Sequence, residues 1–333
     1  MNPGTDAPKP GVLITRRIPD TVLARLEPTL DIDLHTGPAA ISRDDLIARI
    51  RGKRALMCLL TDRVDAAVMD AEPALLVIAN IAVGFDNIDR VAAHTRGIVV
   101  TNTPDVLTEA TADLTWGLVL AACRRIPEGE RLLRRGQWQG WALDFMLGSD
   151  LRGKQLGIVG YGRIGRAVAA RAAAFGMHVV FATLEGDAPA ANTIPGAARR
   201  VSFETLLTTS DVISFHVPLT PETRHLLDRQ ALGRMKRSAY IVNTSRGPVI
   251  DEGALAWALR EGVIAGAALD VYEREPAVHP DLLALENVVL APHIGSGTVE
   301  TRTAMADLAA RNVLAVLAGQ PPLTPVAFSP SQP

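Results

Sequence analysis

The sequence predicts an α/β protein made of two doubly wound parallel-sheet domains with a cleft between them. A chain of 333 residues is too long for one ordinary core and fits two domains. From Gly11 onwards, short aliphatic or β-branched runs alternate with amphipathic segments, and a second alternation of the same kind begins at Gln155. This order is typical of strands that lie parallel in a sheet with helices on both faces.

The first alternation contains five predicted strands, whose apolar runs are GVLIT, DIDLH, ALMCLL, LLVIAN and IVVTN. Helices are predicted up to Leu26, over 42–51 and over 86–96, where a glycine follows the last turn. A long apolar helix is predicted over 108–125. The Trp-bearing, Gly-punctuated residues 135–154 that come next indicate a linker or a packing arm.

The second alternation contains six predicted strands, with the runs QLGIVG, HVVFA, DVISFHV, AYIVNTS, GAALDV and NVVLAP. Residues 251–261 are predicted to form a helix, because Asp251 can cap its first turn and Gly262 follows its end. Another helix is predicted after Pro292.

Charge and cysteine content narrow the class of partner. The chain has 34 basic and 36 acidic residues and a formal net charge of −2, which gives no electrostatic reason to expect nucleic acid or an anionic membrane. Cys58 and Cys123 each lie in an apolar run, where a free thiol acts as a small buried hydrophobe. The sequence shows neither a secretory signal nor an apolar stretch of about 18 residues. We therefore expect a cytoplasmic protein that binds a small molecule.

The glycine-rich turn at 160–165, GYGRIG, follows the apolar strand LGIV and opens an Ala-rich helix. In that context Gly160 makes the tight turn, Gly162 lets the backbone approach a pyrophosphate, and Gly165 allows the helix to pack on the strand. The start of the helix offers free N–H groups and partial positive charge to phosphates. The pattern predicts a Rossmann-like dinucleotide site.

The end of the next strand bears on the choice of coenzyme. An acidic residue about 20 positions after the glycines would bind the ribose 2′-hydroxyl of NAD. Thr183 stands there instead, and Glu185 comes two places late, so nothing clearly repels a 2′-phosphate. The basic residues that follow, Arg199 and Arg200, are as readily explained as a solvated pair. The sequence favours NADP(H) and leaves NAD(H) open.

Three polar segments follow predicted strands in the second half: NTSRG at 243–247, LDVYEREP at 269–276 and APHIGSGT at 291–298. Loops beyond the carboxyl ends of parallel strands line the ligand crevice, so Arg246, Glu275 and His293 are expected to converge. Reduction of a 2-oxo acid needs a cation that binds carboxylate through a planar fork and an acid with a pKa near neutrality. Arginine suits the first role, and histidine, oriented by a glutamate, suits the second. No metal site is predicted.

These segments, with GYGRIG and NTPDVLTEATAD at 102–113, resemble the D-isomer-specific 2-hydroxyacid dehydrogenase family. The resemblance covers the chain from about Val12 to Pro321. Within the family, ANIAVGFDNID at 79–89, the VLTEATADLTW helix and GQWQGW at 136–141 are most similar to glyoxylate and hydroxypyruvate reductases.

The resemblance implies a flavodoxin-like substrate domain over 1–102 plus 292–333 and an NAD(P)-binding domain over 103–291. It implies that Arg246 binds the substrate carboxylate and carbonyl, that His293 donates the proton and that Glu275 orients His293. Leu59, beside Leu60, together with the N–H groups of Val83 and Gly84, would contact the substrate. The coenzyme contacts it implies, beyond Gly160, Gly162, Gly165 and Thr183, are Thr108, Arg163, Ile164, His216, Val217, Pro218, Thr223, Thr244, Ser245, Asp270 and Gly295.

The expected function is NAD(P)H-dependent reduction of a small 2-oxo acid, glyoxylate or hydroxypyruvate, to the 2-hydroxy acid, by an oxidoreductase of the class that acts on CH–OH donors. Two alternatives stay open. One is a dehydrogenase for another small acid, such as D-lactate, 3-phosphoglycerate or an inorganic oxyacid; the other is an NAD(H)-sensing protein similar to corepressors of this fold. A homodimer is expected from the resemblance and from the apolar helix over 108–125. Trp138 and Trp141 fit either the core or a neighbouring subunit's site.

Overall fold

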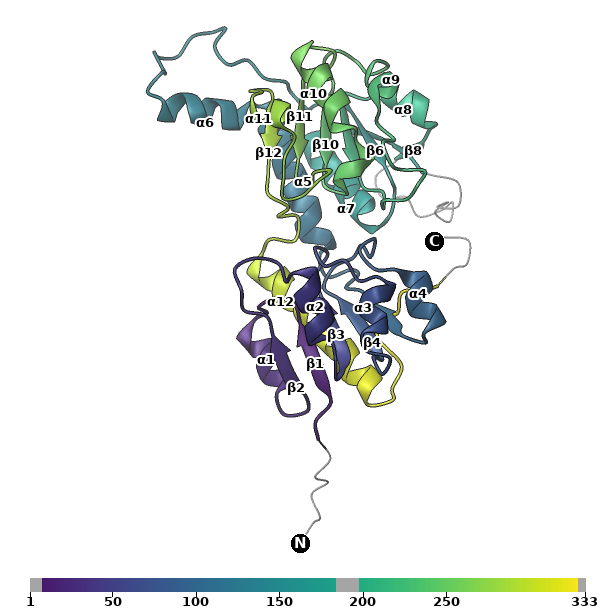
Figure 1. Cartoon of the computed structure of the whole chain (residues 1–333). Coiled ribbons are helices and arrows are strands. Elements are labelled where there is room, and N and C mark those ends of the chain that lie inside the picture. Colours follow the sequence, from purple (N-terminus) through teal and green to yellow (C-terminus); the bar gives the residue numbers. More distant parts are fainter. Residues whose placement is uncertain (1–7, 184–197, 329–333) are drawn as a thin grey trace. The chain divides into compact units, whose positions relative to one another are not determined.

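The computed structural model describes residues 8–183 and 198–328. Two compact units are present: unit 1 is Met1–Leu107 with Thr298–Pro333, and unit 2 is Thr108–Gly297. Each unit contains one parallel sheet flanked by helices (Figure 1). The α/β architecture with two parallel sheets is therefore confirmed. Glu185 lies outside the described residues.

Unit 1 contains a five-stranded sheet with the order β2-β1-β3-β4-β5 and only parallel pairs. This is the flavodoxin-like order. The strands, all at predicted positions, are β1 (Gly11–Ile14), β2 (Asp31–Leu34), β3 (Lys53–Cys58), β4 (Val77–Asn80) and β5 (Val99–Thr101). The central strands β1 and β4 are buried along their whole length, as expected of parallel strands covered on both faces.

The helices of unit 1 are α1 (Asp20–Leu26), α2 (Arg43–Arg49), α3 (Ala66–Asp70), α4 (Arg90–Thr95) and α12 (Val299–Leu317). Four of these five helices begin where a short polar side chain caps them, whereas α1 follows Pro19 and has no side-chain cap among the described residues. The predicted helix over 86–96 was too long at its start, because Asp89 accepts a hydrogen bond from the Ala92 N–H at 2.8 Å and so caps a helix that begins at Arg90.

Unit 2 contains a seven-stranded sheet with the order β12-β11-β10-β9-β6-β7-β8, again with only parallel pairs. The strands are β6 (Gln155–Val159), β7 (His178–Ala182), β8 (Arg199–Arg200), β9 (Val212–Phe215), β10 (Tyr240–Asn243), β11 (Gly266–Leu269) and β12 (Val288–Leu290). Chain order reverses between β6 and β9, which is the switch point where Rossmann-like sheets bind dinucleotides. The exposed pair Arg199 and Arg200 forms the short edge strand β8, which the sequence did not predict.

The helices and short 3-10 turns of unit 2 are α5 (Thr108–Cys123), α6 (Ile126–Arg134), α7 (Arg163–Ala172), η1 (Ala173–Phe175), α8 (Phe203–Thr209), α9 (Arg229–Leu232), η2 (Gly247–Val249), α10 (Glu252–Arg260) and α11 (Pro280–Leu283). The predicted cap of α10 is confirmed, because Asp251 accepts from the Ala254 N–H at 2.9 Å. Both cysteines are free and buried, as predicted. Within the described residues, no helix has the length and apolar character needed to cross a membrane.

Candidate active site and dinucleotide site

The predicted site residues of unit 2 gather at the carboxyl edge of its sheet. The glycine turn follows β6, Thr183 follows β7, and His216, Val217 and Pro218 follow β9. Thr244, Ser245 and Arg246 follow β10, Asp270 and Glu275 follow β11, and His293 and Gly295 follow β12. Because all these strands are parallel, the loops meet at one edge. Thr108 begins α5, and Thr223 lies in the long segment after β9.

The three glycines of the turn have different surroundings. Gly160 has φ +91°, and a Cβ there would lie 2.6 Å from the His216 carbonyl oxygen. A Cβ on Gly165 would lie 2.2 Å from the Gly160 carbonyl oxygen. A Cβ on Gly162 would meet nothing within 4 Å. The first and third glycines are thus required by the fold, whereas the space above Gly162, at the start of α7, is open for a phosphate group.

Three buried polar atoms in the loops after β6, β7 and β9 have no hydrogen-bond partner within the described chain. They are Tyr161 Oη in the glycine turn, Thr183 Oγ1 just after β7 and His216 Nδ1 just after β9. The other ring nitrogen of His216 lies 2.8 Å from Ser214 Oγ. Burial lowers the pKa of His216 to about 3, so the ring is neutral at physiological pH. Unpaired buried polar atoms of this kind are typical of a site completed by a ligand. The residues present therefore fit a dinucleotide.

The hydroxyl groups of two predicted coenzyme contacts are engaged by the protein itself. Thr223 is buried, and its Oγ1 donates to the Pro218 carbonyl at 2.7 Å and accepts from the Thr220 N–H at 2.7 Å. Thr244 Oγ1 lies 3.0 Å from Thr115 Oγ1 on α5. Both side chains hold loops in place, and their direct contact with a coenzyme stays a prediction.

Asn243, which the sequence analysis missed, shapes the turn that presents Arg246. Its Oδ1 accepts from the N–H and the hydroxyl of Ser245 at 3.0 and 2.8 Å, and its Nδ2 donates to the Arg246 carbonyl at 2.9 Å. Arg246 is partly buried, and its guanidinium donates to the Ser245 carbonyl at 2.8 Å. An amide side chain at the end of a predicted strand was the available signal.

Glu275 and His293 form the pair expected from the sequence, although they are 18 residues apart. His293 Nδ1 lies 2.8 Å from Glu275 Oε2, while Glu275 Oε1 accepts from the Tyr272 N–H at 3.0 Å. Burial alone would raise the pKa of Glu275. The hydrogen bond and charge of His293, the Tyr272 N–H and the positive charge of Arg246 outweigh burial and lower it. An ionised Glu275 can only accept hydrogen bonds, so it holds the proton on Nδ1 of His293.

Asp270 fixes the loop that carries His293. Its two carboxylate oxygens accept from the N–H groups of Ile294 and Gly295, both at 2.7 Å. Burial raises the pKa of Asp270 in spite of these bonds. His293 has a left-handed backbone with φ +52°, which aims its ring at Glu275. Tyr272 also anchors this loop, because its hydroxyl donates to the Ala291 carbonyl at 2.8 Å.

The predicted substrate contacts Leu59, Val83 and Gly84 lie in unit 1, after β3 and β4. Val83 and Gly84 are held through their carbonyl oxygens, which accept from the side-chain amides of Asn102 and Asn80, both at 2.8 Å. Within the described part of the chain, the N–H groups of Val83 and Gly84 donate to no acceptor. Two adjacent N–H groups of this kind suit an anion.

The fold and the grouping of these side chains define a dinucleotide-dependent dehydrogenase. Residues 116–295 match the family model described as D-isomer specific 2-hydroxyacid dehydrogenase, NAD binding domain, and these residues lie within unit 2. The chain belongs to the D-isomer specific 2-hydroxyacid dehydrogenase family.

Curated relatives include the glyoxylate reductase of Thermofilum pendens, which is 49% identical over 318 residues that cover 94% of this chain and 93% of that protein. The glyoxylate reductase of Thermococcus litoralis is 49% identical, with 94% and 96% covered. Among solved structures, an NADPH-dependent glyoxylate/hydroxypyruvate reductase from Sinorhizobium meliloti, in complex with NADP and malonate, has a TM-score of 0.84 at 36% identity, with 96% of this chain and 97% of that chain covered.

Replacement of Gly162 separates ligand binding from folding. In Gly162→Val the added Cβ meets nothing within 4 Å, so we expect an unfolding midpoint close to that of the native protein. We expect at least about a tenfold loss of NADPH affinity, since the side chain blocks the pyrophosphate. Gly165→Ala is the control, because its Cβ clashes with backbone and should destabilise the fold by about 2 kcal/mol. Coenzyme fluorescence and urea unfolding measure both effects. Unchanged affinity in Gly162→Val would refute the assigned phosphate position.

The low pKa of His216 predicts a pH dependence of stability. In the unfolded chain a histidine takes up a proton below about pH 6.5, whereas folded His216 stays neutral down to about pH 3. The unfolded state therefore binds more protons in this window, and stability falls as pH falls, by up to about 1.4 kcal/mol per pH unit. We expect His216→Asn to lose this slope between pH 6 and 4.5 in urea unfolding. Parallel curves for the two proteins would show that His216 titrates normally.

Proposed function

We propose that the protein is an NAD(P)H-dependent reductase of small 2-oxo acids, with glyoxylate and hydroxypyruvate as substrates. The observation that carries this proposal is the Glu275–His293 pair, 2.8 Å apart, with the charge of Arg246 acting on the same carboxylate. Reduction of a carbonyl next to an acid group needs a cation and an imidazole whose tautomer is fixed by a carboxylate, and these three side chains supply them. The names of the curated relatives support the same reaction.

Each of the three side chains takes a distinct role. The Arg246 guanidinium binds the substrate carboxylate through its fork and stabilises negative charge on the carbonyl oxygen as it develops. Protonated at both ring nitrogens, His293 donates the proton on Nε2 to that oxygen, while Glu275 keeps Nδ1 protonated and stabilises the imidazolium. A bound reduced nicotinamide supplies the hydride to C2 of the substrate.

Unit 1 supplies the features expected of substrate contacts. The N–H groups of Val83 and Gly84, which have no acceptor among residues 8–183 and 198–328, suit a carboxylate. Asn87 holds the other loop, since its side-chain amide donates to the Leu59 carbonyl at 3.0 Å. We expect the side chains of Leu59 and Leu60 to limit the substrate to an acid of two or three carbons. A phosphorylated substrate would need a further cation near these loops. Arg63 is close in sequence, but its side chain is 84% exposed and pairs with Asp65, which argues against that alternative.

NADPH is the coenzyme we favour. Thr183 offers a hydroxyl with no partner in the described chain at the end of β7, where an acidic residue would repel a 2′-phosphate. The complex of the Sinorhizobium meliloti reductase with NADP supports this choice.

The direct test follows the loss of nicotinamide absorbance when purified protein is mixed with glyoxylate or hydroxypyruvate and with NADPH or NADH in parallel. We expect turnover with both acids and a higher kcat/KM with NADPH. His293→Ala should reduce kcat by at least about a hundredfold while NADPH still binds, because only proton donation is removed. Arg246→Lys should also damage catalysis, because a point charge cannot reproduce the fork.

Two results would contradict this function. If the protein binds NADPH tightly but consumes it with neither acid, the assignment to small 2-oxo acids fails and a sensing role gains support. If Arg246→Lys turns over at nearly the normal rate, the bidentate role of that side chain is wrong.

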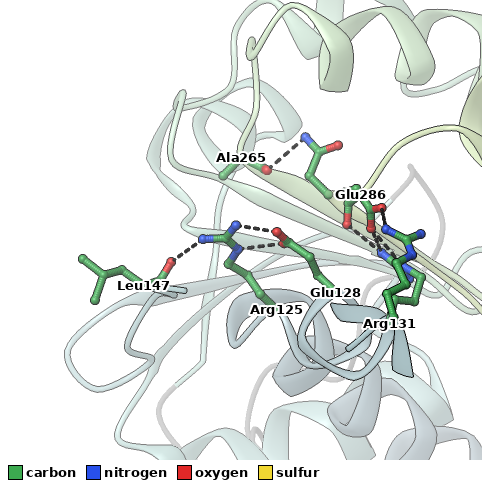
Figure 2. Close-up of polar contacts among 8 residues, drawn as sticks. Arg125, Glu128, Arg131, Leu147, Ala265 and Glu286 are labelled. Carbon is green, nitrogen blue, oxygen red and sulfur yellow. Dashed lines mark hydrogen bonds and ion pairs between the residues drawn. The ribbon is translucent and has the colours of Figure 1, made fainter. Parts of the chain in front are cut away.

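We also propose that the protein is a homodimer joined through an arm, defined as residues 126–147, which α6 opens. Figure 1 shows α6 and the segment after it extending away from the sheet of unit 2. Figure 2 shows how the arm is anchored: Arg125 reaches Glu128 and the Leu147 carbonyl, and Arg131 reaches Glu286 before β12. Large apolar side chains are nevertheless exposed along it, namely Ile126, Leu133, Trp138, Trp141, Leu143, Phe145 and Leu147.

These exposed side chains favour a second copy of the chain as the partner of the arm. Trp141 is 81% exposed, and a groove of about 330 Å³, lined by Ile126, Leu133, Trp138 and Phe145 among others, lies along α6. Contiguous apolar surface on an ordered segment marks an association site, and an arm that bears both apolar projections and an apolar groove is suited to meeting its own copy. The exposure of Trp138 and Trp141 contradicts a core position within one subunit.

Light scattering after gel filtration tests the dimer. We expect twice the chain mass of 35.5 kDa for the native protein and a single chain mass for the double variant Trp141→Asp, Leu143→Asp, because charge in an apolar interface is unfavourable. Val91→Asp, which alters an exposed apolar side chain of unit 1, should stay dimeric. A native protein that is monomeric at micromolar concentration would refute the proposal.

A further inference from the structure

Two glutamates outside the catalytic group bind each other's backbone. Glu252 opens α10, and Glu273 lies in the turn after β11 that also carries Glu275. Glu273 Oε1 accepts from the Glu252 N–H at 2.9 Å, and Glu252 Oε1 accepts from the Glu273 N–H at 2.7 Å. Glu252 is only 5% exposed. The reciprocal pair therefore links the first turn of α10 to the turn at 272–275 through two hydrogen bonds, each from a backbone N–H group to a carboxyl oxygen.

A histidine attaches a third segment to this pair. His225 Nε2 lies 3.0 Å from Glu273 Oε2, the carboxylate oxygen that does not contact Glu252. The backbone N–H of His225 donates to the Pro248 carbonyl at 2.7 Å, and Pro248 lies in η2, two residues after Arg246. Glu273 is thus connected on one side to α10 and on the other to the segment that follows Arg246.

The arginine turn and the glutamate turn also touch directly. A Cβ built on Gly247 would lie 1.8 Å from the Tyr272 carbonyl carbon, so the backbone after Arg246 rests on the backbone that precedes Glu275. Only glycine fits at this crossing. Any shift of the turn at 272–275 therefore moves it relative to Arg246.

We propose that Glu252 and Glu273 are positioning residues that hold the Glu275–His293 pair in register with Arg246. The proposal rests on the function proposed above and goes beyond it, since neither side chain belongs to the catalytic group. A reacting geometry has little tolerance, because a displacement of about 1 Å can cost about a hundredfold in rate. Side chains that hold a catalytic turn from behind are one way to meet that tolerance.

The chain offers matched variants for the test. Glu252→Ala removes the acceptor for the Glu273 N–H, whereas Glu252→Gln keeps a carbonyl oxygen at the same place. Asp251→Ala is the control, because Asp251 caps the same helix at Ala254 and its side chain makes no hydrogen bond with the turn at 272–275 within the described chain.

For glyoxylate reduction we expect Glu252→Ala to lower kcat by about tenfold or more, with NADPH affinity within twofold of the native value. Glu252→Gln should stay within about threefold of native kcat, and Asp251→Ala should lose stability without this loss of kcat. An unchanged kcat in Glu252→Ala would overturn the proposal. Equal losses in all three variants would also overturn it, because they would reflect the stability of α10 alone.

A second readout does not depend on turnover. The proton shared by His293 Nδ1 and Glu275 should give a downfield imidazole N–H resonance in ¹⁵N-histidine-labelled protein, assigned by its absence in His293→Ala. We expect Glu252→Ala to shift or broaden this resonance and Glu252→Gln to preserve it. If the native protein reduces no 2-oxo acid, the proposed function fails, and this resonance still decides the positioning role: an unaltered signal in Glu252→Ala overturns it.

Discussion

The parallel alignment of the seven strands in unit 2 is the constraint on which the site depends. Chain order reverses between β6 and β9, and the loops that leave these two strands are in contact, since Gly160 packs on the His216 carbonyl. On the far side of the switch point, the adjacent strands β10, β11 and β12 deliver Arg246, Glu275 and His293 in turn. One topological feature therefore places the glycine turn and the group of Arg246, Glu275 and His293 along a single edge, although the residues come from distant parts of the chain.

Side-chain hydrogen bonds, called polar clamps below, fix the conformation of the loops that carry Arg246 and His293; apolar packing does not. Asn243 closes the arginine turn, Asp270 holds the His293 loop by two N–H groups, and Tyr272, which follows β11, donates to the Ala291 carbonyl at the start of that loop. Buried hydrogen bonds are directional, so they fix a loop in one conformation more narrowly than apolar contacts do. The apolar core around the sheet stabilises the fold, and the polar clamps fix the conformation of the loops.

Much of this arrangement was predictable because it is local. Strands read from apolar runs, the glycine turn and the cap at Asp251 each depend on a few consecutive residues, and all appear as expected. The hydrogen bonds of Asp270 and Tyr272 escaped prediction because their partners are far away in sequence: Asp270 accepts from residues 24 and 25 positions later, and Tyr272 donates to a residue 19 positions later. The turn that Asn243 shapes spans only three residues and was missed although its signal is local. The start of α4 was misplaced for a local reason, since Asp86 and Asp89 both resemble caps and only the fold decides between them.

The negative charge on Glu275 determines which nitrogen of His293 can exchange a proton with a substrate. Burial opposes the ionised form of Glu275, and the charge stays on it because His293, Arg246 and the Tyr272 N–H stabilise it. The same ionised carboxylate keeps Nδ1 of His293 protonated and leaves Nε2 as the nitrogen that can exchange a proton with a substrate. Arg246 consequently has two effects, because the cation suited to hold a substrate carboxylate also helps keep Glu275 ionised. If these residues have the roles proposed above, removal of Arg246 would weaken both the proton donor and the anion site, and the arginine, glutamate and histidine should behave as one unit rather than as three additive contributions.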